Sequence, residues 1–289
     1  RADPTAAVAP ERVRASRPLP VQPGLYGHFA LGSRGLLWSI LGAEVIAIGC
    51  TPDGLNINHE VGATHPEALV RAVLANHADY GIALDGDADR ITVVDEKGAV
   101  KDGDQLMAMI ADYANRHDTI KGGGIAATLM SNLGLERFLR IRGLKLHRTK
   151  VGDRYVMEAM KAHGLNIGGE QSGHLILGDY ATTGDALVAG LHILAALMED
   201  GRPASEAMRL FEPVPQVLNN VRFAGGTPLA HAPVQQAIAA AEAALGRDGR
   251  IVVRPSGTEP LIRIMIEGED RARITQMAED IATLIRQAT

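Results

Sequence analysis

The chain has 289 residues, of which 46% are hydrophobic and 3% aromatic, and its formal net charge is −5. This length allows two or three domains with a sizeable core. An acidic balance with no basic stripe of interleaved aromatic residues argues against a nucleic-acid partner, and no apolar run is long enough to predict a membrane span. The single cysteine, Cys50, excludes an internal disulfide or a thiolate metal site and fits a reducing cytoplasm.

The N-terminal third of the chain changes character near residue 41. Residues 1–41 are dense in Arg, Pro and Ala and show no apolar period, so we expect an irregular segment. From residue 42 onward, strand-like runs alternate with helical patterns, which indicates α/β units. The elements expected over 42–98 are Glu44–Ile48, Ala68–Asn76, Tyr80–Leu84 and Ile91–Asp95.

Two further domains are predicted after the turn at 96–98. Over 99–213 we expect helices and strands at Asp104–Asn115, Ile125–Thr128, Leu133–Ile141, Leu144–Thr149, Arg154–His163, Thr183–Met198 and Ala204–Leu210. Over 214–289 we expect Val217–Phe223, Pro233–Leu245, two strands near 251–266, and Arg271–Gln287. The predicted fold class is therefore α/β, with tandem mixed-sheet domains over 42–98 and 99–213 followed by a small α+β domain over 214–289.

A short acidic sequence follows the apolar run Tyr80–Leu84. It reads Asp85-Gly-Asp-Ala-Asp-Arg90 and is called the metal loop below. On a continued strand the three alternating carboxylates would line one face with no group to neutralise their charge. A loop that contains glycine lets them surround a hard cation such as Mg²⁺. Arg90 adds a guanidinium that can take phosphate oxygens, so the loop suits metal-assisted phosphoryl transfer. The competing interpretation is a solvated acidic turn.

Two more loops carry polar side chains in patterns that suit a phosphorylated sugar. Arg254-Pro-Ser-Gly-Thr-Glu-Pro260 lies between two apolar runs, and with Arg263 on the second run it resembles a nest for phosphate. We call it the phosphate loop. In the sugar loop, Gly168–His174, the side chains of Glu170, Ser172 and His174 alternate, so an extended backbone would direct all three to one side. Each of these motifs also fits ordinary turn chemistry or a structural histidine. Asp102 and Asp104 flank a helix start and are explained as caps.

Taken together, these loops and the segment Lys150-Val-Gly-Asp-Arg154 resemble the phosphohexomutase superfamily in its own motif order. The segments Asp53–Asn58 and Thr128–Asn132 are similar to the phosphoglucosamine mutase branch. The resemblance covers roughly Leu41 to Thr289 and implies the second, third and fourth domains of a four-domain fold. In this family the first domain carries a loop with a phosphorylated serine, and no segment of the chain resembles that loop. The chain by itself is therefore expected to be inactive.

The resemblance also implies roles for individual residues. It implies an isomerase that interconverts glucosamine 6-phosphate and glucosamine 1-phosphate through a bisphosphate, in the cytoplasm and on the route to UDP-N-acetylglucosamine. Asp85, Asp87 and Asp89 would hold Mg²⁺, while Arg90 and Lys150 offset phosphoryl charge. Glu170, Ser172 and His174 would bind sugar hydroxyls, and His174 or Lys150 would move the proton. The residues that would hold the second phosphate are Arg254, Ser256, Gly257, Thr258 and Arg263.

Other functions stay open on the sequence. A phosphomannomutase or phosphoglucomutase would use the same loops on a different hexose phosphate. A non-catalytic protein that binds sugar phosphate would follow from the unmatched serine loop. A phosphatase of the haloacid dehalogenase type would use an Asp-x-Asp pair after a strand, but the sugar and phosphate loops have no role there. The oligomeric state is not predicted.

Overall fold

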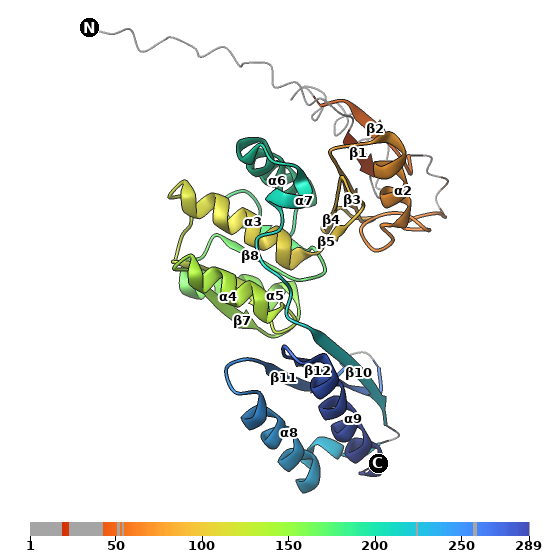
Figure 1. The fold of residues 1–289 in the computed structure, drawn as a ribbon, viewed down its shortest axis with the longest axis vertical. Coiled ribbons are helices and arrows are strands. Elements are labelled where there is room, and N and C mark those ends of the chain that lie inside the picture. The colour runs from red at the N-terminus through yellow and green to blue at the C-terminus, as the bar shows by residue number, and fades with distance from the viewer. Residues whose placement is uncertain are drawn as a thin grey trace, which may run out of the picture. The chain divides into compact units, whose positions relative to one another are not determined.

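The computed structural model of the chain describes residues 19–22, 43–50, 53, 55–223, 225–256 and 259–288 (Figure 1). The chain divides into two compact units. The first comprises Arg1–Thr128 and His147–Leu210, and the second comprises Leu129–Leu146 and Phe211–Thr289. The described helices include none that is long and apolar enough to cross a membrane.

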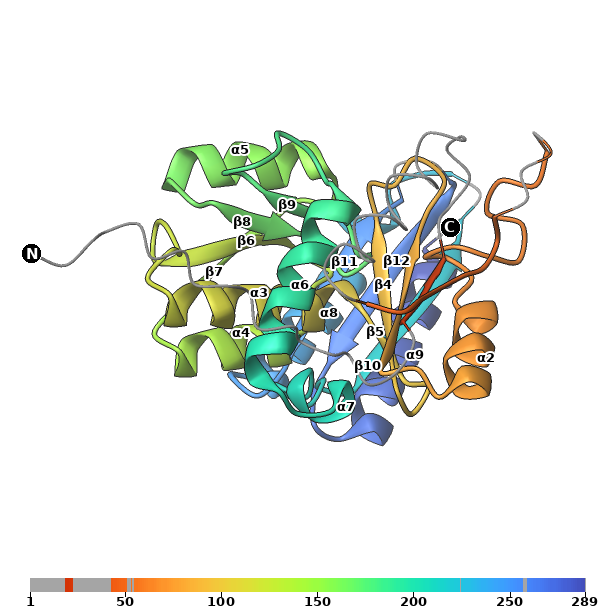
Figure 2. The same ribbon diagram turned by 90° about the horizontal axis from the view of Figure 1, so that it is seen from above.

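The first unit contains a mixed five-stranded sheet in the order β2-β1-β3-β4-β5. Its strands are β1 (Leu19–Gln22), β2 (Val45–Ala47), β3 (Tyr80–Leu84), β4 (Ile91–Asp95) and β5 (Val100–Lys101). Strand β1 runs parallel to β2 and β3, whereas β3–β4 and β4–β5 are antiparallel. Helix α2 (Glu67–Asn76) lies beside this sheet (Figure 2). Its buried residues Leu69 and Val73 belong to the core that the helix shares with the sheet.

Strand β1 corrects the expectation of an irregular segment throughout 1–41. It inserts between β2 and β3, with Pro20 opposite Ile46. A proline cannot donate to a ladder and argues against an interior strand. The sequence Leu-Pro-Val-Gln therefore does not predict a strand by itself. It becomes one because β2 and β3 pair with it on both sides. The rest of 1–41 lies outside the described residues.

A four-stranded sheet in the order β7-β6-β8-β9 forms the other half of this unit. Its strands are β6 (Gly124–Thr128), β7 (Lys145–Thr149), β8 (Ile167–Gly169) and β9 (Leu175–Leu177), and its helices are α3 (Gly103–Arg116), α5 (Asp153–His163), α6 (Ala186–Asp200) and α7 (Ala204–Ala207). Strand β8 is parallel to β6 and antiparallel to β9, so this sheet is also mixed, as expected. Helix α3 packs against β8 and α6.

The second unit is built on the antiparallel sheet β10-β12-β11. Its elements are β10 (Gln216–Arg222), β11 (Arg250–Pro255), β12 (Leu261–Glu267), α4 (Leu133–Ile141), α8 (Ala232–Leu245), α9 (Arg271–Gln287) and the short 3₁₀ helix η1 (Pro228–Ala230). Helix α9 buries Ile274, Ala278 and Ile281 in one stripe, together with Ile285, which forms the core with β12. The elements β10 to α9 form the small α+β fold that the sequence predicts, whereas α4 comes from the segment predicted within the middle domain.

The segment Leu129–Leu146, predicted within the middle domain, groups with the second unit because polar contacts join them. Asn132 donates to the Val214 carbonyl at 3.0 Å and accepts from the Val214 N–H at 2.9 Å. Arg250 forms an ion pair with Glu267, whose side chain is fully buried, and donates to the Leu129 carbonyl at 2.7 Å and to the Ser131 carbonyl. A buried carboxylate paired in this way requires its partner.

Replacing Arg250 with alanine is expected to destabilise the second unit by about 3 kcal/mol, because the buried Glu267 carboxylate loses its guanidinium partner. Native-state hydrogen exchange of the β12 amides measures the loss. Arg247→Ala, at an exposed position of the preceding turn, is the matched control. Equal protection of β12 in the two variants would contradict a stabilising role for the pair.

Candidate functional site

The metal loop is the connection between β3 and β4. The Ala88 N–H donates to the Asp85 carbonyl at 3.1 Å, and the Arg90 N–H donates to Asp85 Oδ1 at 3.0 Å. Ala88 adopts the left-handed conformation, with φ of 59°, which few residues other than glycine adopt. The loop therefore curls, as the sequence predicts, and does not continue the strand.

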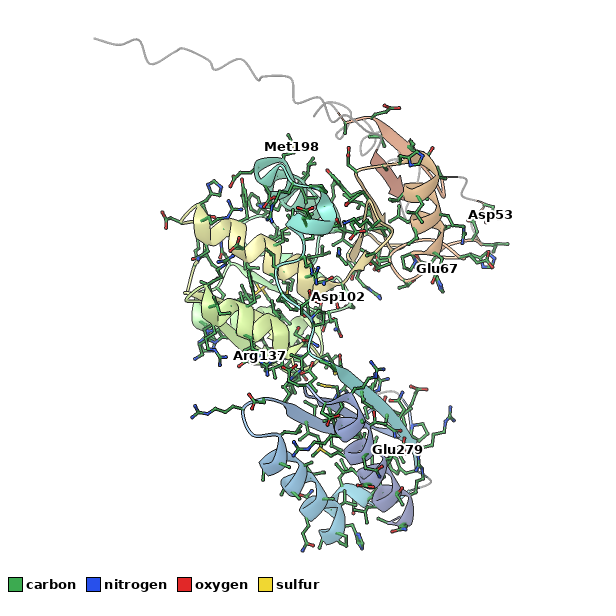
Figure 3. All side chains as sticks on the ribbon, in the orientation of Figure 1. Asp53, Glu67, Asp102, Arg137, Met198 and Glu279 are labelled. Carbon is green, nitrogen blue, oxygen red and sulfur yellow. The ribbon has the colours of Figure 1, made fainter. Side chains whose placement is uncertain are left out.

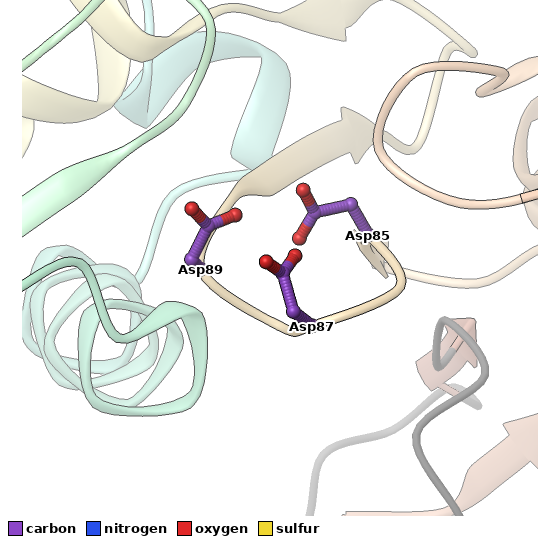
Figure 4. Close-up of side chains that lie close together, drawn as sticks. All are labelled: Asp85, Asp87 and Asp89. Carbon is purple, nitrogen blue, oxygen red and sulfur yellow. The ribbon is translucent and has the colours of Figure 1, made fainter. Parts of the chain in front are cut away.

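The three carboxylates of this loop converge (Figure 4). Asp85, Asp87 and Asp89 each offer an oxygen, and these oxygens lie within 4.8 Å of one another. Burial, together with the neighbouring Asp89, raises the pKa of Asp85 to about 6. Burial also opposes ionisation of Asp89, but Asp85, His174 and Arg90 hold its pKa below the usual value. Close carboxylates of this kind need a cation nearby.

The donor set fits a hard metal ion. All three groups supply oxygen, the ligand atom that hard divalent cations take. Oδ1 of Asp89 is buried and accepts no hydrogen bond from the described residues. Arg90 is a nearby cationic group, with Nε 3.0 Å from Asp85 Oδ2 and 3.5 Å from Asp89 Oδ1. One guanidinium offsets only part of three negative charges, so the geometry leaves room for a cation.

The sugar loop is a hairpin turn and not an extended segment, which corrects the expected alternation. The Gly173 N–H donates to the Glu170 carbonyl at 3.0 Å, and the Glu170 N–H donates to the His174 carbonyl at 2.9 Å, so the chain reverses between β8 and β9. Glu170 and Ser172 stay together, with 3.4 Å between Oε2 and Oγ. His174 points elsewhere because the turn ends the two-residue period.

His174 is buried, with 5% of its surface exposed, and both ring nitrogens have protein partners. The Gly184 N–H donates to Nε2 at 3.1 Å, so Nδ1 carries the proton and donates to Asp89 Oδ2 at 3.0 Å. Neither nitrogen is available to a sugar hydroxyl in this arrangement, contrary to the expectation. The ring instead holds a carboxylate of the metal loop in place, as second ligand shells do in metal sites.

Backbone contacts join the metal loop and the sugar loop directly. The Ile91 N–H donates to the Gly173 carbonyl at 3.0 Å, and Arg90 and His174 form an isolated antiparallel bridge. Gly173 has φ of +90°, and a Cβ there would lie 2.1 Å from the Ile91 carbonyl oxygen. Only glycine allows this approach.

Lys150 lies near the sugar loop through its own segment. The Gly152 N–H at the start of α5 donates to Glu170 Oε1 at 2.9 Å. Lys150 is exposed, and its Nζ lies 5.7 Å from the centre of the Tyr155 ring. The structure therefore brings Glu170, Ser172 and the Lys150 segment together in the first unit.

The phosphate loop belongs to the second unit. Arg254 on β11 lies directly opposite Arg263 on β12, and Nε of each is buried without a hydrogen-bond partner among the described residues. Burial, followed by the charge of Arg263, lowers the pKa of Arg254. Ser256 donates its N–H to the Leu261 carbonyl at 2.8 Å. Gly257 and Thr258, predicted as phosphate ligands, lie outside the described residues. Arg263 also lies 3.6 Å from Glu259, so one carboxylate offsets part of this positive charge. Two like charges with unused Nε donors suit an anion.

Sequence reasoning missed the support of the sugar loop by helix α3. Asp102, labelled in Figure 3, caps α3 through the Gln105 N–H at 3.1 Å, as expected, but it also accepts from Gln171 Nε2 at 3.2 Å. The Gly103 N–H donates to the Gln171 carbonyl at 2.9 Å. A Cβ on Gly103 would lie 2.1 Å from the Glu170 carbonyl oxygen. Gln171 therefore anchors the sugar loop to the start of α3.

Comparison with protein-family models matches three consecutive stretches of the chain. The models describe domain II (residues 29–98), domain III (residues 102–214) and the C-terminal domain (residues 218–284) of phosphoglucomutase/phosphomannomutase. The chain belongs to this family. The domain II match begins at residue 29, within the segment that we expected to lie outside the family. Family membership removes the dehalogenase-type phosphatase from consideration.

Curated bacterial relatives and solved structures agree with that assignment. Phosphoglucosamine mutase of Rhizobium meliloti (strain 1021) is 61% identical over 249 residues, which cover 86% of this chain and 55% of the relative. The Agrobacterium fabrum enzyme of the same name is 59% identical over 252 residues, covering 87% of this chain and 56% of the relative. The chain thus spans about half the length of these relatives.

The solved structures show the same fold. An Aspergillus fumigatus N-acetylphosphoglucosamine mutase, in complex with GlcNAc-6P and magnesium, matches with a TM-score of 0.76 at 19% identity, over 93% of this chain and 66% of that one. A phosphoglucomutase/phosphomannomutase family protein from Burkholderia thailandensis gives 0.75 at 23% identity, over 95% and 62%.

Gly103→Ala is expected to displace the sugar loop, because the added Cβ overlaps the Glu170 carbonyl oxygen. Amide shifts and hydrogen exchange over residues 168–174 measure the change. Gly178→Ala is the control, since the nearest atom to its Cβ is the flexible end of Met160, at 3.2 Å. A sugar loop that is equally protected in both variants would contradict the support by α3.

Proposed function

We propose that this chain carries the metal-binding, sugar-binding and phosphate-binding parts of a phosphoglucosamine mutase. The reaction would interconvert glucosamine 6-phosphate and glucosamine 1-phosphate through a bisphosphate. The observation that carries the proposal is the convergence of three carboxylates within 4.8 Å, in a chain about 60% identical to proteins of that name. The same reaction would place the protein in amino-sugar metabolism towards UDP-N-acetylglucosamine, in the cytoplasm.

Asp85, Asp87 and Asp89 are proposed to hold Mg²⁺, because the site offers only oxygen ligands. When bound, the ion would stabilise the negative charge of a phosphoryl group in transfer. Arg90 would share that task from beside the loop. Its Nε is committed to Asp85, while its side chain is 41% exposed and leaves other donors for phosphate.

Glu170 and Ser172 are proposed to bind the sugar. One oxygen of Glu170 accepts from Gly152, which fixes the carboxylate, and the other lies beside Ser172. A fixed carboxylate with spare lone pairs suits sugar hydroxyls or an amino group as donors. Lys150, exposed next to this segment, supplies positive charge. A role for His174 in proton transfer requires the Gly184 N–H to release Nε2. The Lys150 ammonium is exposed and lies over the Tyr155 ring.

Arg254 and Arg263, with Ser256 and with the predicted ligands Gly257 and Thr258, are proposed to hold the phosphate that does not react. Two opposed guanidiniums with unused Nε donors gain most from a doubly charged anion between them. This separation of tasks suits a substrate with two similar ends, since one clamp and one reactive site serve both orientations.

Two other functions use the same loops. A phosphoglucomutase or phosphomannomutase activity is favoured by the description of the family models, which name those enzymes. A non-catalytic protein that binds sugar phosphate would keep the loops and lack the transfer step. The relative affinities for different hexose phosphates would distinguish these mutases from one another. Turnover of glucosamine 6-phosphate would exclude a non-catalytic protein.

Asp87→Asn is expected to weaken Mg²⁺ binding by about tenfold or more, because one charged ligand is lost. Titration of the Ala88 and Arg90 amide shifts with Mg²⁺ measures the affinity. Asp87 is exposed, so its replacement leaves the fold intact. Asp118→Asn is the control, at an exposed left-handed position that asparagine tolerates. Unchanged affinity in Asp87→Asn would remove this loop as the metal site.

Glucosamine 6-phosphate is expected to bind at millimolar affinity and to shift the amides of Ser172 and Ser256. Arg254→Ala should abolish the Ser256 shift, since one of the two opposed guanidiniums is gone. Arg271→Ala, at the exposed start of α9, should retain it. Weaker binding of glucose 6-phosphate at equal concentration would support the amino sugar, and stronger binding would favour the glucomutase alternative. Shifts confined to other surfaces would contradict both.

A further inference from the structure

A second pocket lies in the first unit, away from the candidate site. It has a volume of about 490 Å³ and is lined by the C-terminal half of α3, the middle of α6, and residues next to β8 and β9. This volume is typical of pockets for small organic ligands, at roughly 300–1,000 Å³. The sugar loop packs on the other end of α3, at Gly103. The pocket therefore shares no residue with the metal, sugar or phosphate loops.

Aromatic and imidazole rings form much of its wall. Tyr113 and His117 lie one turn apart on α3, with 4.5 Å between ring centres. Tyr180 and His192 meet edge to face at 4.9 Å, from the segment after β9 and from α6. Aliphatic side chains such as Ile110 and Leu177 supply the remaining apolar surface. Flat rings prefer to stack or meet edge to face with other rings, so these walls suit a planar aromatic ligand.

The charged groups at the pocket are already paired with one another. Asp179 forms an ion pair with Lys121 and accepts from Asn166 Nδ2 at 2.7 Å. His117 contacts Glu199 at 2.6 Å, and Glu199 also pairs with Arg116. An ionic ligand would have to break these pairs, whereas an uncharged ligand would not.

Polar groups remain for an uncharged ligand. The side chains of Tyr113, Tyr180 and His192 make no hydrogen bond to another residue in the described part of the chain, although all three line the pocket. Burial lowers the pKa of His192, so its imidazole stays neutral and offers one donor and one acceptor. Two hydroxyls and one neutral imidazole match the donor and acceptor edge of a heterocycle.

We propose that this pocket binds an uncharged planar heteroaromatic ring of nucleobase size. The ring lies against Tyr180 and His192, and its polar edge pairs with the imidazole of His192 and the hydroxyl groups of Tyr113 and Tyr180. The site is independent of the mutase reaction, since none of its residues belongs to the three loops.

The test is a titration of the isotope-labelled full chain with adenosine, followed by amide shifts, with ribose as the ligand control. Saturable shifts are expected at Tyr113, Tyr180 and His192 and not over residues 168–174. Tyr180→Ala and His192→Ala should each weaken binding about fivefold or more, the loss typical of one removed stacking partner. Tyr180 is 67% exposed, so its truncation spares the core. His163→Ala, on α5 and outside the pocket lining, is the matched control.

Three results would overturn the proposal. The first is the absence of saturable shifts up to the solubility of adenosine. The second is binding of unchanged strength in both Tyr180→Ala and His192→Ala. The third is an equal response to ribose, which would assign the shifts to the sugar and not to the ring.

Discussion

Mutual repulsion of three carboxylates is the constraint around which the first unit is organised. Asp85, Asp87 and Asp89 lie within 4.8 Å, and two of them are wholly or partly buried. The fold counters this repulsion with a left-handed turn at Ala88, an ion pair from Arg90 and the donated proton of His174. These contacts hold the loop in shape, but one buried oxygen of Asp89 accepts no hydrogen bond from the described residues. A loop so held is preorganised for a cation, which lowers the cost of binding it.

The hairpin of the sugar loop contacts both the metal loop and the start of α3. Its Gly173 carbonyl accepts from Ile91 at the end of the metal loop, while Gln171 contacts Asp102 at the start of α3. Glu170 is fixed by Gly152, which ties the Lys150 segment to the same turn. Groups proposed to contact metal, sugar and phosphoryl oxygens thus rest on one network of short contacts. A displacement of any one of these segments would therefore displace the groups on the others.

The second unit follows the same principle with opposite charge. Arg254 and Arg263 face each other with unused donors, and the sheet that carries them is anchored by the Arg250–Glu267 pair. Glu259 lies 3.6 Å from Arg263 and offsets part of this charge. The two like charges still repel each other, and an anion between them would relieve that repulsion. The first unit thus gathers carboxylates that suit a cation, and the second gathers guanidiniums that suit an anion.

The sequence by itself determined the strongest periodic elements and the residues of the loops. Tyr80–Leu84, Ile91–Asp95, Leu133–Ile141 and Arg271–Gln287 form as expected, because their apolar patterns match one secondary structure. Tertiary structure decided the rest. Strand β1 needs its neighbours to overcome Pro20, and the turn after β8 brings His174 to Asp89 and ends its alternation with Glu170 and Ser172. The role of Gly103 is visible only once the Glu170 carbonyl lies above it, since a close approach between distant segments leaves no periodic signal.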